Sequence, residues 1–145
     1  MYNIEGANSG HMAFTSGGLA QGTTATTFKT VNTVTYTIDG VLTSKVAADN
    51  LPFSAGHKPV PPGSQCIFGV WLDSAGAVST SQGYIMPNEG SVAPLPDFLS
   101  DKCCVGLVKV QTNSATTFTP NTTNLNAAGV TSTYFNTSQL PGKAK

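Results

Sequence analysis

The sequence predicts an all-β domain, a small β-sandwich or jelly-roll-like barrel, preceded by an extended N-terminal arm. Strand-forming Thr, Val and aromatic residues are plentiful, whereas Glu occurs only at Glu5 and Glu89. Short alternating runs are separated by Gly, Pro and Asp-Gly turn signals at intervals of roughly 8 to 12 residues. With 145 residues, the chain is long enough for one domain with a hydrophobic core and too short for two comfortable ones.

Residues 1–27 are predicted to be the arm. They are mostly Gly, Ser, Thr, Ala and Asn, and their apolar residues follow neither the period of a strand nor that of a helix. Such a segment buries too little apolar surface to offset its ordering entropy, so we expect another copy of the chain or a partner to hold it. The predicted partner-binding anchors are its widely spaced apolar side chains: Tyr2, Ile4, Met12, Phe14 and Leu19.

The β domain is predicted over residues 28–145 and begins with a hairpin. The run TTFKTVNTVTYTIDG alternates well enough for one long strand or two short ones, and VLTSKVA follows the Asp39-Gly40 turn. Asp-Gly readily adopts the positive φ angles of a tight hairpin turn. The alternation places Tyr36 and Ile38 on one face, which we expect to point inward.

Two strongly apolar runs are predicted to be core strands. They are QCIFGVWLD at residues 65–73 and CCVGLVKV at residues 103–110. Residues 47–64 before the first run are predicted to be a loop, because they contain four prolines that cannot donate hydrogen bonds to a β-ladder.

The remaining segments connect and complete the predicted sheets. AVSTSQGYIM at residues 77–86 alternates as a strand does, and a Pro-rich connection follows at residues 87–97. A single helical turn is predicted over residues 96–102, with Asp97 favourably placed near its start. The last strand or strand pair is predicted at residues 125–135.

Charge is unusually sparse in this chain. Only 10% of residues are charged, against roughly 25% in typical soluble domains, and the net charge is zero. All seven basic residues are lysine, which argues against nucleic acid and against an anionic membrane surface as partners. No apolar run approaches the roughly 18 residues of a spanning helix, and no signal peptide is predicted at the N-terminus. A neutral, Thr- and Gly-rich surface favours contact with other protein in an assembly.

No constellation of residues predicts catalysis or a metal site. The two histidines, His11 and His57, have no nucleophile motif near them in sequence. The soft ligands His57, Cys66, Cys103 and Cys104 lack the paired spacing of zinc sites. We therefore predict no enzyme activity, no cofactor and no metal.

The cysteines and the single tryptophan are predicted to be structural. Cys103 and Cys104 point to opposite faces if they lie in a strand, so they are not expected to bond to each other. Three reduced thiols fit a reducing compartment, and a bridge from Cys66 to one of the pair stays open. Trp71 is expected in the core, with stacking on a carbohydrate as the alternative.

Three stretches of the chain resemble small virion structural proteins of tailed bacteriophages. They are FKTVNTVTYTIDGVLTSKVAADN, IFGVWLDSAGAVSTSQG and CCVGLVKVQTNSATTFTPNTTNLNAAGVTSTYF, within about residues 28–135. Among these proteins, the chain is most similar to capsid decoration or cement proteins. The resemblance implies a β-rich, often trimeric protein on the outside of the phage head, where capsid subunits meet. The expected partners are the major capsid protein and further copies in a homotrimer, in virions assembled in the host cytoplasm.

Two other functions stay open. A tail fibre, head fibre or spike module that recognises a host glycan or protein would use Thr-rich hairpins and one Trp equally well. A small hydrolase becomes the better hypothesis only if His57 is buried beside a carboxylate and a nucleophile.

Overall fold

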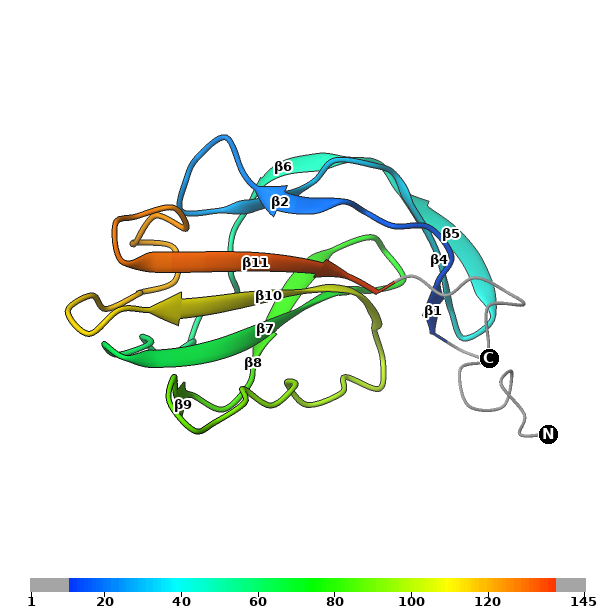
Figure 1. Ribbon diagram of the computed structural model, residues 1–145. Coiled ribbons are helices and arrows are strands. Elements are labelled where there is room, and N and C mark those ends of the chain that lie inside the picture. Colours follow the sequence, from blue (N-terminus) through cyan, green and yellow to red (C-terminus); the bar gives the residue numbers. More distant parts are fainter. Residues whose placement is uncertain (1–10, 138–145) are drawn as a thin grey trace.

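The computed structural model describes residues 11–137, and within this range the chain forms strands and no helix. The predicted all-β class is confirmed, and the strands form a small β-sandwich (Figure 1). Tyr2 and Ile4 lie outside the described residues. The strands, in chain order, are β1 Met12–Ala13, β2 Leu19–Gln21, β3 Phe28–Thr30, β4 Val34–Ile38, β5 Val41–Lys45, β6 Ala48–Leu51, β7 Ser64–Leu72, β8 Val78–Gln82, β9 Met86–Pro87, β10 Cys103–Thr112 and β11 Val130–Asn136.

One layer of the sandwich is built from three chain segments, and each segment consists of two consecutive strands separated by a short break in the β structure. β1, β4 and β5 form one antiparallel sheet, and β2, β3 and β6 form another in the matching order. The β3–β4 segment therefore runs along the centre, with the β1–β2 segment on one side and the β5–β6 segment on the other. Hydrogen bonds from Val31 N to Gly18 O and from Asn32 N to Gly17 O continue the pairing across the interruption.

The hairpin between β4 and β5 has the predicted turn and the predicted inward face. Asp39 and Gly40 both have positive φ, at 51° and 76°, and Ile38 pairs directly with Val41. Val34, Tyr36 and Ile38 are buried, while the threonines between them are partly exposed. The strand alternation that the sequence shows is thus the alternation of core and surface.

The second layer is a sheet in the order β11-β10-β7-β8, with β9 pairing to the first residues of β7. The two predicted core strands, β7 and β10, lie side by side at its centre. Almost every residue of β7 is buried because this strand is covered on both faces. The main core fills the space between the two layers, where the rings of Phe28, Phe53, Phe68 and Phe118 meet edge to face.

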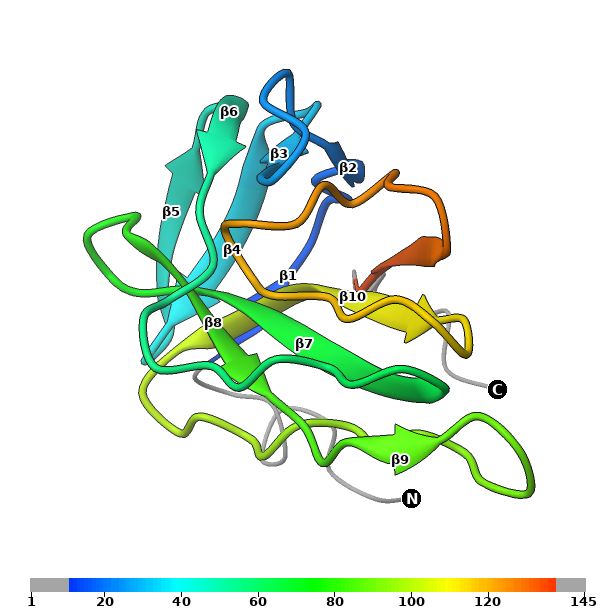
Figure 2. The same cartoon turned by 90° about the vertical axis from the view of Figure 1, so that its left-hand side faces the viewer.

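The outer face of β7 is covered by the connection between β9 and β10 rather than by a third sheet. Figure 2 shows this connection running beneath β7 and β8, on the side away from β3–β6. Trp71 points to this side, is only 2% exposed, and donates a hydrogen bond from Nε1 to Ser81 Oγ at 2.7 Å. Because the Trp71 ring is buried, it is a core residue, as expected, and is not placed to stack on a carbohydrate.

Two predicted connections differ in the structure. Residues 48–51 belong to the predicted loop but form β6, which pairs with β3. The side chains of Asp49 and Asn50 accept hydrogen bonds from Thr23 N and Thr24 N, and these bonds hold a stretch with poor strand propensity in place. Residues 96–102 contain only a turn, closed by Lys102 N and Leu99 O at 3.3 Å, instead of a helical turn.

The described part of the predicted arm, residues 11–27, packs against the chain's own domain. Met12 and Ala13 pair with β4, and Leu19–Gln21 pair with β3. Ala13 and Leu19 belong to the core cluster. Within the described range, residue 27 therefore does not separate an arm from the core. The apolar side chains of residues 11–27 are too few to form a core of their own, but they fit into gaps between the strands of the domain.

Candidate docking surfaces

The three described anchor residues of the arm differ in how much they expose. Met12 and Phe14 are half-buried, while Leu19 is only 6% exposed. Leu19 fills the space left by the missing side chain of Gly106 in β10. Leu19 therefore stabilises its own domain and presents little surface to a partner, whereas Met12 and Phe14 remain partly accessible.

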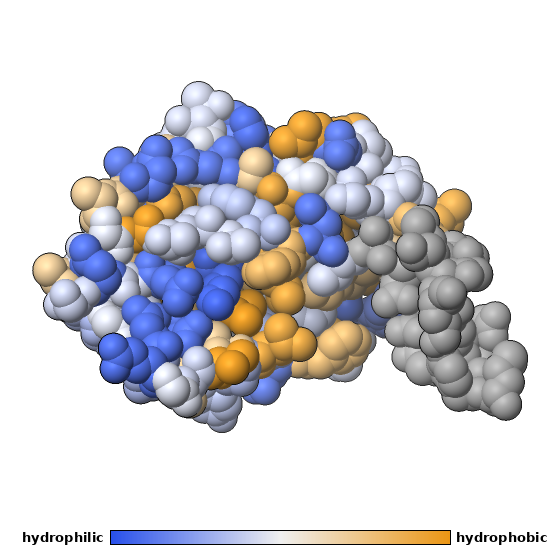
Figure 3. Space-filling model, viewed as in Figure 1, coloured by the Kyte–Doolittle hydropathy of each residue, from blue (hydrophilic) through white to orange (hydrophobic). Residues whose placement is uncertain are grey.

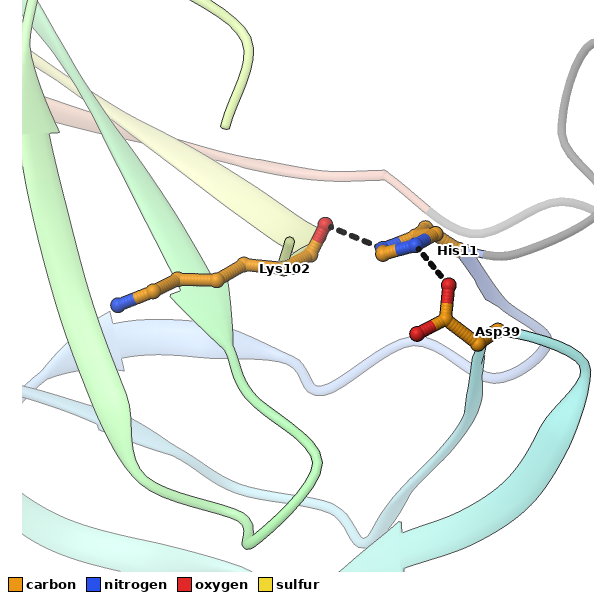
Figure 4. A network of polar contacts seen from close by, with 3 residues as sticks. All are labelled: His11, Asp39 and Lys102. Atoms are coloured by element: carbon orange, nitrogen blue, oxygen red, sulfur yellow. Dashed lines mark hydrogen bonds and ion pairs between the residues drawn. The ribbon is translucent and has the colours of Figure 1, made fainter. Parts of the chain in front are cut away.

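The side chain of His11, the first described residue, contacts two other segments of the chain (Figure 4). Its Nε2 lies 3.2 Å from Asp39 Oδ1 in the β4–β5 turn, and its Nδ1 lies 3.1 Å from the carbonyl oxygen of Lys102 before β10. Both partners are acceptors, so forming both hydrogen bonds at once requires a hydrogen on each ring nitrogen, as in the imidazolium ion. The pair with Asp39 is then a charge-assisted contact at the surface.

The most conspicuous surface feature is a group of exposed apolar side chains beside the covered face of β7. We call it the ledge; its members are 67–86% exposed and are Tyr84, Val92, Leu95 and Phe98. Figure 3 shows hydrophobic surface along the lower middle of the molecule, where Figure 1 places the β9–β10 connection. Tyr84 and Leu95 line a shallow hollow of about 170 Å³ together with Gln82, Gly83 and Asp97.

The backbone under the ledge is held in place by buried contacts. Gln65, 2% exposed, donates from Nε2 to Pro87 O at 3.1 Å and to Ser91 O at 3.0 Å. Pro94 and Pro96 lie directly over glycines, since a Cβ at Gly83 would come within 2.9 Å of Pro94 O. These contacts keep the ledge in a defined position.

Phe98 is fixed by a ring beneath it. It packs edge to face on Trp71, with ring centroids 5.6 Å apart, yet 73% of its own surface is exposed. Because the Phe98 ring already packs on one side, less side-chain entropy is lost when a partner covers it than for a ring with no contact.

A second exposed apolar group lies on the β4–β5 hairpin. Val41 is 68% exposed, Leu42 64% and Val46 69%. They lie on or just after β5, which pairs with β4 on one side only. β5 is thus an edge strand of its sheet and also carries exposed apolar side chains.

His57 does not meet the condition set for a hydrolase in the described structure. Its Nε2 lies 2.7 Å from the hydroxyl of Thr80, and its ring packs 5.4 Å from that of Phe68. Burial lowers the pKa of His57, so the ring favours the neutral form. No ion pair of His57 with a carboxylate is found among residues 11–137.

The three cysteines are free thiols in the structure. Cys66 pairs across the sheet with Val110, and Cys103 pairs with Leu72, six residues further along β7. At about 3.3 Å per residue, this separation is far too long for a disulfide from Cys66 to either of the adjacent cysteines. Burial raises the pKa of Cys66 to about 11 and that of Cys103 to about 12, so neither thiol is an activated nucleophile.

One polar hollow lies at the end of the sheet, where Asn88, Gln111 and Asn113 surround about 270 Å³ of open space. The amide of Asn88 is already engaged, because its Nδ2 donates to Thr112 O at 2.7 Å. Within residues 11–137, no group of three or more His, Cys, Asp or Glu side chains is close enough to hold a metal ion. In the same range, no helix is long and apolar enough to cross a membrane.

Comparisons with known proteins return no matching family model, no matching curated protein and no matching solved structure.

Sequence reasoning missed the ledge because its residues fall in three different predicted segments: Tyr84 in a strand, Val92 and Leu95 in the Pro-rich connection, and Phe98 in a helical turn. A signal was nevertheless present. Val92, Leu95 and Phe98 recur within seven residues among prolines, although a solvated loop has no need of large apolar side chains.

Proposed function

We propose that the chain is a virion structural protein, a capsid decoration protein that binds the outer surface of a phage head and stabilises contacts between capsid subunits. The observation that carries the proposal is the ledge, a fixed apolar surface on a chain of zero net charge. Contiguous exposed apolar side chains on a monomer mark sites where other proteins bind.

The residue composition of the ledge resembles that of the centre of a protein–protein interface. Its two aromatic rings, Tyr84 and Phe98, belong to the residue types that are enriched there, while charged residues are depleted. Only one acidic residue, Asp97, lines the hollow between Tyr84 and Leu95. A stable interface buries about 800 Å² per partner, so the ledge would form its centre and neighbouring polar residues its rim.

The choice of a phage head as the partner rests on the sequence resemblance. A decoration protein needs little charge and an adhesive β surface, and both the low charge content and the exposed apolar residues on β strands and loops support the proposal. The major capsid protein is the proposed partner, further copies of the chain are proposed neighbours on the head, and the virion exterior is the proposed location.

A direct test uses phage particles that lack the protein. Particles from a deletion strain should lose their DNA on mild heating, and purified protein added back should restore retention. Leu95→Ser and Phe98→Ser should each weaken binding to these heads at least about tenfold, since each removes a buried apolar contact of the interface. Val31→Ser is the matched control, because Val31 is 56% exposed but lies between β3 and β4, in the other layer.

The alternative, a fibre or spike module, is favoured by one observation. Tyr84 is an exposed ring that lines the same hollow as Asp97, a combination suited to stacking on a sugar and accepting its hydroxyl hydrogens. Gel densitometry of virions separates the two functions. A decoration protein should approach the major capsid protein in copy number, whereas a fibre module should be a small fraction of it.

A further inference from the structure

We propose that the free edge of β5 pairs antiparallel with β5 of a second copy of this chain. The two β1-β4-β5 sheets would then form one continuous sheet across a two-fold axis. This surface is separate from the ledge, and the inference does not depend on the proposed function.

The outer side of β5 offers unpaired backbone groups. Ile38 and Val41 flank a two-residue turn, so Val41, Thr43 and Lys45 are the residues whose backbones bond to β4. The N–H and C=O groups of Leu42 and Ser44 therefore point away from the sheet. Within residues 11–137, neither residue makes a backbone hydrogen bond to any other segment.

The edge of β8 is covered, unlike that of β5. Ser54 N donates to Thr80 Oγ1 and Thr80 N donates to Ser54 Oγ, each at 2.8 Å. Lys58 N also donates to Gln82 Oε1 at 2.8 Å. The loop after β6 thus occupies this edge through side chains.

The edges of β6 and β11 are blunted by other means. In β6, Asn50 has a positive φ of 55° and Asp49 carries a charge, both of which oppose strand addition. At the end of β11, the side chain of Asn136 accepts a hydrogen bond from Leu19 N at 2.9 Å. β11 also keeps an open side along Ser132 and Tyr134, but its one exposed large apolar side chain is Phe135, whereas β5 combines an open side with both Val41 and Leu42.

The side chains of β5 also favour a partner. Val41 and Leu42 are exposed and apolar, and the strand has no proline and only one charge, on Lys45. Natural edge strands are usually protected by charges, prolines or bulges, because an unprotected apolar edge pairs with other chains. β5 lacks most of this protection, as expected if its edge is used.

A second copy fits because the strand is complementary to itself in one register. In the register that pairs both outward-pointing residues of each copy with those of the other, Leu42 lies opposite Ser44 and Thr43 lies opposite Thr43. Lys45 of each copy then lies opposite Val41 of the other, within reach of Asp39 two residues further along. The hairpin carries one charge at each end, on Asp39 and on Lys45, and these charges are opposite in sign, although Asp39 also contacts His11 of its own chain.

This contact is isologous and closes after two copies. It places a neighbouring strand beside Val41 and Leu42 of both chains, one on each face of the sheet, and satisfies the outer backbone groups of Leu42 and Ser44. A homotrimer, as the sequence resemblance implies, would need a different surface. The oligomeric state and its response to β5 variants therefore test the inference.

The first experiment measures the mass of the full chain by native mass spectrometry and by light scattering after gel filtration, over a range of concentrations. We expect a monomer–dimer equilibrium. Leu42→Lys should weaken the dimer at least about tenfold, because it places like charges on neighbouring strands at the axis. Val31→Lys is the matched control and should leave the dimer unchanged, since Val31 is similarly exposed but lies outside β5.

The second experiment tests the register. Thr43→Cys should form a covalent dimer under mild oxidation, because the two Thr43 residues occupy a non-hydrogen-bonded pair with Cα atoms about 4.5 Å apart. Ser44→Cys faces Leu42 rather than itself and should cross-link far less, and the unmodified chain controls for its own thiols. A monomer at all concentrations, a trimer, or a dimer unaffected by Leu42→Lys would overturn the inference. Equal cross-linking of both cysteine variants would overturn the register.

Discussion

At the scale of single residues, His57 gives the folded domain a measurable dependence on pH. Burial lowers its pKa below the ordinary value of 6.5, so the unfolded chain binds a proton more readily than the folded one. Between pH 6.5 and the lower folded pKa, the free energy of unfolding should therefore fall as the pH falls. Urea unfolding of the wild type and of His57→Gln, measured between pH 7.5 and pH 5, checks this.

The glutamine variant is informative because its amide can still bond to Thr80 but cannot titrate. We expect a flatter pH profile for His57→Gln than for the wild type. Hydrogen bonds from the backbone N–H groups of Ala77 and Ala75 lower the pKa of Asp73. Protonation of Asp73 therefore lowers the free energy of unfolding only when the pH falls below 3.8, the ordinary pKa of this side chain. Parallel profiles for the two proteins above pH 5 would contradict the role of His57.

The cysteines should be slow to react while the domain is folded. Burial raises the pKa of all three thiols and leaves Cys66 and Cys103 with almost no accessible surface. Because the thiolate is the reactive form, we expect negligible labelling of Cys66 and Cys103 by a thiol reagent at pH 8 and complete labelling in guanidinium chloride. Mass spectrometry of the labelled peptides identifies each site, and rapid labelling of either residue in the native protein would count against the structure.

At the scale of elements, the approach of β2 to β10 depends on Gly106. A Cβ on Gly106 would collide with Leu19 Cδ1 and would lie 2.7 Å from the carbonyl oxygen of Phe135. Gly106→Ala should therefore lower the free energy of unfolding by about 1–3 kcal/mol. In a Leu19→Ala background the same change should cost less, because one of the two collisions is gone. Equal costs in the two backgrounds, measured by urea unfolding, would show that β2 does not contact β10 in this way.

The N-terminal segment can be divided by truncation. Removal of residues 1–10 keeps β1, β2 and the core residues Ala13 and Leu19 in the chain, so we expect this variant to fold and to unfold cooperatively. Removal of residues 1–20 also deletes Ala13 and Leu19 from the core and should cost at least about 2–5 kcal/mol. Circular dichroism and urea unfolding distinguish the two outcomes, and similar stabilities would mean that β1 and β2 contribute little.

The shorter truncation also isolates the predicted anchors. Tyr2 and Ile4 are removed while Met12, Phe14 and Leu19 stay in place. If binding to phage heads is lost while the fold is kept, the first residues are anchors as the sequence predicts. If binding is unchanged, the ledge is sufficient without them.

Local chemistry determined how well each element could be predicted. The Asp39-Gly40 turn and the inward face of Tyr36 depend on neighbours in sequence, so the sequence predicted both correctly. β6 was missed because Asp49 and Asn50 are held by hydrogen bonds to residues 26 positions away. Leu19 was assigned to a partner because the gap that it fills is made by Gly106, which is distant in the sequence.

The candidate site was harder to predict than the fold. The apolar residues of β7 could be recognised as core residues from the sequence. Which face of β7 packs against the other layer, and which face must be covered by a loop, depends on the tertiary structure. The β9–β10 connection covers the side on which Trp71 lies, and this placement leaves Leu95 and Phe98 exposed above it. Exposure of this kind is set by tertiary packing, which alternation along one strand does not reveal.

At the scale of the whole molecule, the near absence of charge should govern how binding responds to salt. The chain has zero net charge, seven lysines and seven acidic residues, and Asp97 is the one charged residue that lines the hollow between Tyr84 and Leu95. Burial of apolar surface, unlike attraction between exposed charges, is hardly screened by ions. The affinity for phage heads that lack the protein should therefore change by less than about threefold between low and moderate sodium chloride. Co-sedimentation with these heads, with Phe98→Ser as the weakened reference, measures it. A steep loss of affinity with salt would mean that charged groups outside the ledge carry the contact.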